Sequence, residues 1–156
     1  MNEQELMVKK NRINSTPPII TTVNLCRDFN SGREVVHALK NVSIEIEPGK
    51  LTILRGRSGS GKSTLINLIG GLDVPTKGKI FFKDKEISSM SNSRKERLRK
   101  ENFGFIFQSV AIISVMSAYE NVEFGLRIAG FDPKLRKASA EESLTLVGLG
   151  KRMHHR

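Results

Sequence analysis

Apolar and polar residues change their spacing along the chain, and the changes predict where strands and helices lie. The stretch IITTVNL (19–25) is rich in β-branched residues, and EVVHAL (34–39) follows a turn at Asn30-Ser31-Gly32, so both ranges are predicted as strands. VSIEIE (42–47) alternates strictly between apolar and polar residues, which is typical of a strand with one exposed face. We expect this strand to be peripheral and antiparallel.

Two shorter runs are continuously apolar. LTIL (51–54) and FGFIF (103–107) have the pattern of strands that are buried on both faces. A further strand region is predicted at GKIFFKDKEI (78–87).

Helices are predicted between and after these strands. A glycine-rich loop opens an apolar helix from about Lys62 to Ile69, which ends at Gly70-Gly71. In SRKERLRK (93–100), Ser93 and Glu96 have the spacing of a capping box, which predicts an exposed helix over about 93–101. From Ser117 a helix runs to a stop at Gly130, and Asp132-Pro133 opens another that extends to about Val147.

Composition places the chain among soluble globular proteins of one domain. Of its 156 residues, 38% are hydrophobic and 27% charged, and residues 1–18 read as a polar tail before the folded part at 19–156. The start MNEQELMVKKNR lacks the apolar core of a signal peptide, and no run approaches the roughly 18 apolar residues of a membrane span. A single cysteine, Cys26, fits a reducing compartment and a structural thiol. We therefore expect a cytoplasmic chain that meets a membrane only through a partner.

The net charge of +10 raises the question of nucleic-acid binding. The basic residues are dispersed, however, and their one local cluster at 93–100 is interpreted as a solvated helix face. Nucleic acid is therefore not expected as a partner.

The strongest motif is GRSGSGKS (56–63), which satisfies the Walker A pattern. Its glycines let successive backbone N–H groups converge on phosphate oxygens, and the following helix directs the positive end of its dipole at the same anion. Lys62 is predicted to reach the β- and γ-phosphates of a nucleotide, Ser63 to bind Mg²⁺ and Thr64 to contact a phosphate. Ser58, Gly59, Ser60 and Gly61 supply the loop itself.

The segments around this loop resemble the ATP-binding subunits of ABC transporters. The resemblance rests on SGSGKSTL, on ALKNVSIEIEPGKLTIL before it, and on GGLDVPTKGKIFF, FGFIFQ and SAYENVEFGLRIAG after it. It is nearest to the branch that serves lipoprotein release, macrolide export and peptide export. It implies an α/β fold: a P-loop NTPase core with an antiparallel β subdomain and part of a helical subdomain, truncated before the LSGGQ signature.

The same resemblance implies roles for two further residues. Phe29 occupies the position of the aromatic residue that stacks on adenine, although Tyr is more common there; by its type alone it would be a core aromatic. Gln108 matches the Q-loop glutamine, which touches Mg²⁺ or the attacking water and relays to the membrane subunit. The helices from Ser117 to Val147 match the subdomain that docks on that subunit.

Several parts that the family uses for hydrolysis do not occur in the sequence. It has no LSGGQ-like segment, Walker B acid or catalytic Glu. Asp84 and Glu86 follow an apolar run but are interleaved with lysines, so they are predicted as surface residues. His154 and His155 precede the place of the signature, so neither is the switch histidine. We expect this chain to bind ATP with Mg²⁺ without turning it over.

The function expected from the resemblance is that of an ABC transporter ATP-binding subunit, working as a homodimer or with an intact copy and driving a permease. The alternative is a nucleotide-binding regulatory module without catalysis, or an inert remnant. A P-loop kinase would need an arginine-rich lid, for which only Arg94, Arg97 and Arg99 offer themselves.

Overall fold

The computed structural model describes residues 16–32, 34–108 and 112–156. The chain divides into two compact units, Met1–Phe103 and Gly104–Arg156, and each is described by itself. Most of the predicted polar tail (1–18) lies outside the described residues, and residues 16–18 have no regular secondary structure.

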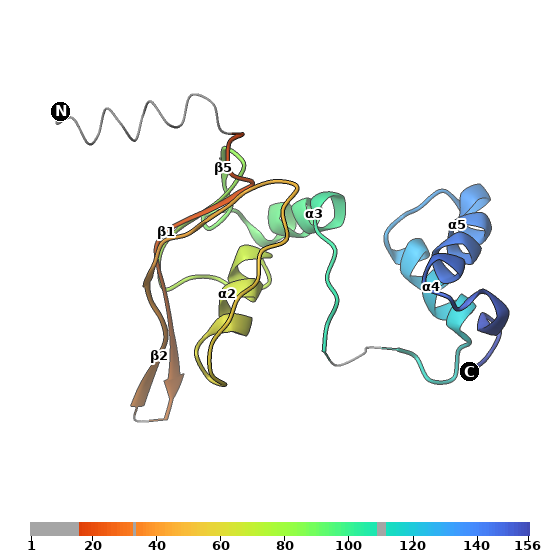
Figure 1. Cartoon of the computed structure of the whole chain (residues 1–156), viewed down its shortest axis with the longest axis horizontal. Helices are drawn as coiled ribbons and strands as arrows, with labels where there is room; N and C mark the ends of the chain where they lie inside the picture. The colour runs from red at the N-terminus through yellow and green to blue at the C-terminus, as the bar shows by residue number, and fades with distance from the viewer. Residues whose placement is uncertain (1–15, 33, 109–111) are drawn as a thin grey trace. The chain divides into compact units, whose positions relative to one another are not determined.

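The first unit is built on an antiparallel sheet with the order β2-β1-β4-β5 (Figure 1). The long strand β1 (Ile20–Ser31) pairs with β2 (Glu34–Val42), with β3 (Glu45–Ile46) and with β4 (Lys77–Phe82), and β5 (Lys85–Glu86) pairs with β4. The strands predicted at 19–25, 34–39 and 78–87 are thereby confirmed. Within 42–47, Val42 ends β2 and Glu45–Ile46 form β3, and the alternation holds over the whole range: the apolar side chains are half-buried and the glutamates exposed.

Strand β1 contains a bulge that changes which of its side chains face the core. Along the ladder with β4, Val23 pairs with Lys79 and Cys26 with Lys77, so β1 carries one extra residue, and Asn24 has a φ of 46°. Before the bulge the buried residues are Ile20 and Thr22, and the next buried residue is Leu25, which has an odd number. The bulge therefore turns the odd-numbered residues that follow toward the core side of the strand.

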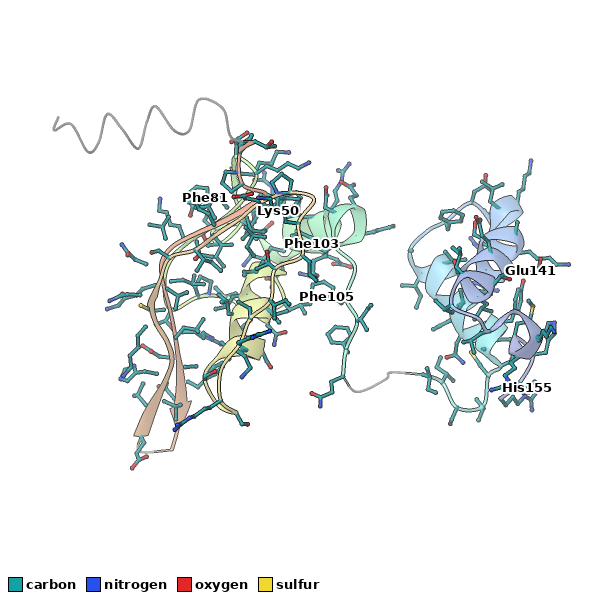
Figure 2. All side chains as sticks on the ribbon, viewed as in Figure 1. Lys50, Phe81, Phe103, Phe105, Glu141 and His155 are labelled. Carbon is teal, nitrogen blue, oxygen red and sulfur yellow. The ribbon has the colours of Figure 1, made fainter. Side chains whose placement is uncertain are left out.

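Helix α2 (Lys62–Ile69) packs its apolar side chains against this sheet. Leu65 and Leu68 are buried and join a core that also contains Ile20, Leu25, Leu39, Ile80, Phe82 and Ile87. Phe103, which is labelled in Figure 2, packs against this core, and its ring centroid lies 5.0 Å from that of Phe82. Each fully buried aliphatic side chain contributes about 1.5–3 kcal/mol, so this small core holds the first unit together.

The prediction of two strands buried on both faces is wrong. Residues 51–57 and 103–107 have no regular secondary structure; Leu51 is 89% exposed, and Ile106 is also exposed. A strand buried on both faces needs sheet neighbours and covering layers, and no strand of the described residues pairs with either run. The apolar pattern indicates that a segment is suited to the middle of a sheet, but it does not provide the strands that would pair with that segment.

Helix α3 (Asn92–Asn102) begins earlier than its sequence pattern predicts. The N-cap is Ser91, which has extended backbone angles, so the predicted capping box of Ser93 and Glu96 is wrong. Lys95 is buried, which means that the basic stretch is not wholly a solvated face.

The second unit is a helical hairpin followed by a short helical turn. Helices α4 (Ala118–Ile128) and α5 (Pro133–Leu146) pack together, and η1 (Gly150–Arg152) follows α5. Asp132 caps α5 as predicted, because its carboxylate accepts a hydrogen bond of 2.9 Å from the backbone N–H of Lys134. No helix among the described residues combines the length and the apolar character that crossing a membrane requires.

A capping box that the sequence reading did not identify opens α4. The Ser117 hydroxyl accepts from the Glu120 N–H at 3.2 Å, and the Glu120 carboxylate accepts from the Ser117 N–H at 2.6 Å. The hydrogen bond from the Ser117 backbone N–H to the carboxylate is the main reason that the pKa of Glu120 lies below its ordinary value, and the Ser117 side chain adds to the effect.

Candidate nucleotide-binding site

The glycine-rich loop leads directly into the N-terminus of α2. Gly61 is the N-cap of the helix and has a φ of 85°, which a residue with a side chain adopts only with strain. A Cβ at Gly61 would overlap the carbonyl oxygen of Ala38 and lie 2.8 Å from the Leu39 side chain. Strand β2 therefore fixes the point where the loop becomes a helix, and only glycine fits there.

Lys62 points into the loop that precedes it. Its Nζ donates hydrogen bonds to the carbonyl oxygens of Gly56 (2.9 Å) and Arg57 (2.7 Å) and lies 3.3 Å from the Ser60 hydroxyl. The loop is thus curled around a positive charge. That charge and the free N–H groups of the first helical turn both favour an anion, and none of the residues in that turn is acidic.

The outer side of the loop is open. A Cβ at Gly59 would meet no heavy atom within 4 Å, and Ser58, Ser60 and Ser63 are exposed. These residues suit a phosphate group, because exposed hydroxyl donors and the helix N-terminus lie beside an ammonium. No three His, Cys, Asp or Glu side chains of the described residues gather as a metal site, so Mg²⁺ here would need nucleotide oxygens beside Ser63.

Phe29 lies on the same hairpin that supports the loop. It pairs with Val36 of β2, and two residues further along β2 the carbonyl of Ala38 abuts Gly61. Two residues of extended strand span roughly 7 Å. Phe29 is 40% exposed, so the hairpin that abuts Gly61 also carries an accessible aromatic residue.

A cation that the sequence pattern did not predict lies beside this ring. The guanidinium of Arg27 lies over Phe29, 4.4 Å from the ring centroid. Arg27 also forms a bidentate ion pair with Asp73, in which Nε and Nη2 each lie 2.8 Å from a carboxylate oxygen. Spacing of two along a strand could have suggested the first contact, whereas nothing in the sequence connects Arg27 to a residue beyond α2.

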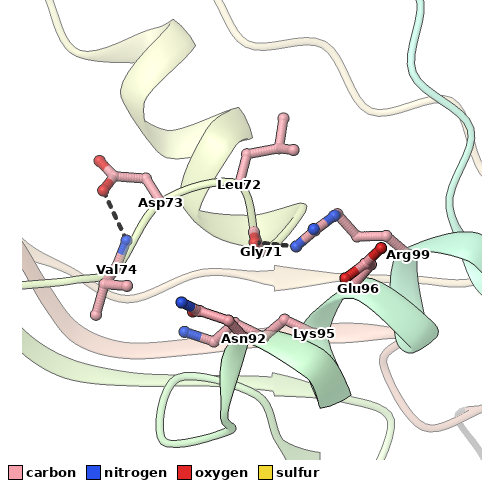
Figure 3. Close-up of a pocket in the computed structure, with 8 residues that line it drawn as sticks. All are labelled: Gly71, Leu72, Asp73, Val74, Asn92, Lys95, Glu96 and Arg99. Atoms are coloured by element: carbon pink, nitrogen blue, oxygen red, sulfur yellow. Dashed lines mark hydrogen bonds between the residues drawn. The ribbon is translucent and has the colours of Figure 1, made fainter.

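The segment that carries Asp73 is held by α3 (Figure 3). Arg99 of α3 donates a hydrogen bond of 2.6 Å to the carbonyl of Gly71, and Asp73 accepts one of 2.7 Å from the N–H of Val74. A cavity of about 330 Å³ lies between the end of α2 and α3, and it is lined by Gly71, Leu72, Asp73, Val74, Asn92, Lys95, Glu96 and Arg99.

Comparison with known proteins identifies the family. Residues 39–156 match the family described as ABC transporter. The chain belongs to the ABC transporter family. It is an ATP-binding domain of that family, as the resemblance predicted, and the α/β fold class predicted from it is confirmed by the solved structures below.

Similar proteins include ATP-binding subunits and fused exporters. An ABC transporter ATP-binding protein of Thermotoga maritima is 43% identical over 138 residues, which are 88% of this chain and 59% of that protein. A macrolide export ATP-binding/permease protein MacB of Marinobacter nauticus is 42% identical over 142 residues, which are 91% of this chain and 22% of that protein.

The solved structure of the ATP-binding cassette MJ0796, a dimer in a post-hydrolysis state bound to ADP and Pi, is also similar. It is 31% identical with a TM-score of 0.80, and the match covers 88% of this chain and 61% of that one. The ABC chain described here thus spans about three fifths of the length of the cassette and of the Thermotoga relative.

Gln108 belongs to the second unit of this ABC domain and is exposed. Its role toward Mg²⁺ stays a prediction.

The acidic and histidine residues that the sequence set aside make contacts within their own units. Asp84 is exposed, and Glu86 on the edge strand β5 pairs with Lys79 at 3.2 Å, which is the main reason that the pKa of Glu86 is lowered. The His154 ring lies 6.0 Å from that of Tyr119, and the backbone carbonyl of His155 accepts from the Ala118 N–H. These contacts are structural, and Glu86 remains a half-exposed carboxylate.

Proposed function

We propose that this chain is the ATP-binding subunit of an ABC transporter that couples ATP binding and hydrolysis to export or extraction of a substrate through a membrane permease. The observation that carries the proposal is the Lys62 ammonium, held in a curled glycine loop at the N-terminus of α2. Family membership supports the same reading.

The proposed site divides by the parts of the nucleotide. Residues 58–64 (Ser58, Gly59, Ser60, Gly61, Lys62, Ser63 and Thr64) contact the phosphates, with Lys62 and the backbone N–H groups neutralising their charge. Phe29 offers its exposed ring to the adenine. Ser63 and Gln108 bind Mg²⁺, which supplies further positive charge at the phosphates when it is bound.

The proposed partners come from the similar proteins. MacB is named as an ATP-binding/permease protein, and the MJ0796 cassette was solved as a dimer. We propose accordingly that this chain pairs with a second copy or an intact ATP-binding subunit and lies on the inner face of the cell membrane through a permease.

By itself, the chain is proposed to bind ATP without turnover. The sequence contains no LSGGQ-like segment, and Asp84 and Glu86, which follow an apolar run as a Walker B acid would, lie on the surface and the sheet edge. ATP hydrolysis would therefore require a partner that supplies these catalytic groups.

The test is equilibrium binding of a fluorescent ATP analogue to the purified chain. Lys62→Ala should abolish saturable binding, because it removes the ammonium that neutralises the phosphates. Lys100→Ala is the matched control, since it removes the same charge from an exposed position in the last turn of α3. Equal binding by the wild type and Lys62→Ala would refute the proposed binding of ATP at this loop.

Steady-state phosphate release tests the second part of the proposal. The chain alone should release no phosphate above the Lys62→Ala background. Turnover that disappears in Lys62→Ala would show that the chain hydrolyses ATP unaided, and this part of the proposal would then be wrong.

A further inference from the structure

We propose that Arg27 is a positioning residue for the nucleotide base: it covers one face of the Phe29 ring and holds that ring still, so that the opposite face receives the base. The inference rests on the proposed function, in which Phe29 contacts adenine. It adds a second, charged layer to that contact and connects it to the helix that binds the phosphates.

The guanidinium of Arg27 lies over the ring of Phe29. Arg27 and Phe29 are two residues apart on β1, so their side chains project from the same side of the strand, and the guanidinium carbon lies 4.4 Å from the ring centroid. That distance is a cation–π contact, in which the planar guanidinium covers one face of the ring. Because Phe29 is still 40% exposed, the ring keeps accessible surface for a ligand.

Arg27 is itself held in place. Its bidentate pair with Asp73 fixes the guanidinium in two directions, and the two side chains are only 24% and 26% exposed. A planar, forked cation with two hydrogen bonds to one carboxylate has little freedom to rotate. Phe29 therefore packs against an immobile surface rather than against a mobile chain.

Asp73 is anchored to β1 and to α2 at once. Its carboxylate accepts from the Val74 N–H, and its own N–H donates to the carbonyl of Asn67 in α2. Thr76 then brackets Arg27 on β1: its N–H donates to the carbonyl of Cys26, and its hydroxyl accepts from the N–H of Asp28. The segment after the phosphate-binding helix thus sets the position of the base-contacting ring through Arg27.

A fixed ring lowers the entropy cost of binding a base. An aromatic residue on a half-exposed strand would otherwise sample several orientations, and binding would have to select one of them. Removing the guanidinium should therefore weaken binding of a nucleotide that has a base, and should leave binding of the phosphates alone unchanged.

Calorimetric titration of the full chain with ATP and with inorganic tripolyphosphate separates binding that involves the base from binding of the phosphates alone. Phe29→Ala should weaken ATP binding about tenfold through lost stacking. Arg27→Ala should weaken it about threefold to fivefold. Tripolyphosphate should bind both variants as it binds the wild type. Arg97→Ala is the control, since Arg97 also pairs with a carboxylate but lies on the exposed face of α3.

The double variant Arg27→Ala with Phe29→Ala decides whether Arg27 acts through the ring. It should bind ATP no more weakly than Phe29→Ala alone. Should Arg27→Ala fail to fold, Asp73→Asn serves in its place, because it keeps the shape of the side chain while removing the charge that holds Arg27.

The outcomes separate the inference from the proposed function. If Phe29→Ala weakens ATP binding and Arg27→Ala does not, the positioning role is overturned and the base contact stands. Equal losses of ATP and tripolyphosphate binding in Arg27→Ala would mean a general structural role and would also overturn the inference. If Phe29→Ala leaves ATP binding unchanged while Lys62→Ala abolishes it, the base contact itself is wrong.

Discussion

Replacing Gly61 by alanine tests the claim that β2 sets the shape of the phosphate loop. Gly61 has a φ of 85°, and a Cβ there would overlap the carbonyl oxygen of Ala38. Gly59 is a matched control, because its φ is 78° but a Cβ there would meet no heavy atom within 4 Å. The two variants share the backbone strain and differ in the steric overlap.

The expected cost follows from those two terms. Left-handed backbone costs a residue with a side chain about 1–2 kcal/mol, and this term applies to Gly59→Ala and Gly61→Ala alike. Overpacking against a fixed neighbour adds about 1–3 kcal/mol, and this term applies to Gly61→Ala alone. The free energy of unfolding should therefore fall by about 2–5 kcal/mol in Gly61→Ala and by about 1–2 kcal/mol in Gly59→Ala.

Urea unfolding followed by far-ultraviolet circular dichroism measures both losses. Binding of the fluorescent ATP analogue should also weaken more in Gly61→Ala, since the overlap moves the start of α2 away from the loop. Equal losses of stability in the two variants would show that strand β2 does not constrain the loop, and the reasoning would be refuted.

Two further predictions concern acid stability and the exposed apolar run. Because the pKa of Glu120 is lowered in the folded state, its stabilising contribution is present above about pH 4.3 and is lost as the pH falls through the lower folded pKa. Glu120→Gln should remove this acid-dependent loss, as seen in the fluorescence of Tyr119, the single tyrosine of a chain without tryptophan. Leu68→Ala should cost about 2–5 kcal/mol and Leu51→Ala less than about 0.5 kcal/mol in urea unfolding, because Leu68 is fully buried and Leu51 is exposed.

Each of these has a clear contrary result. An acid transition of Tyr119 fluorescence that is the same in the wild type and in Glu120→Gln would remove the capping box as its cause. Comparable losses for Leu51→Ala and Leu68→Ala would mean that Leu51 packs in solution against something that the structure does not contain.

The sequence predicted the elements whose cause is local. Alternation in 42–47 is reflected in burial, Asp132 caps α5, and the glycine loop leads into a helix that starts at Lys62. Each depends on neighbours within a few residues of the chain, so the pattern carries the information needed.

The parts that escaped prediction depend on distant residues. The pairing of Arg27 with Asp73 joins positions 46 apart in the chain, and no local pattern indicates it. Strict alternation from Ile20 would also place Arg27 on the wrong side of β1, because the bulge at Asn24 is not visible in the hydrophobic pattern. The strands predicted around Leu51 and Ile106 were wrong for the opposite reason: their apolar pattern is clear, but no described strand pairs with them.

Because of the bulge in β1, the side of the strand on which Phe29 lies depends on the number of residues that precede it. Deleting the one extra residue between Val23 and Cys26 would leave every other amino acid in place, yet it would turn Arg27 and Phe29 to the reverse side of the strand. A change of residue type at Asn24 preserves that count, whereas a change of length does not. Natural variation in this strand should therefore tolerate substitutions far more readily than insertions or deletions.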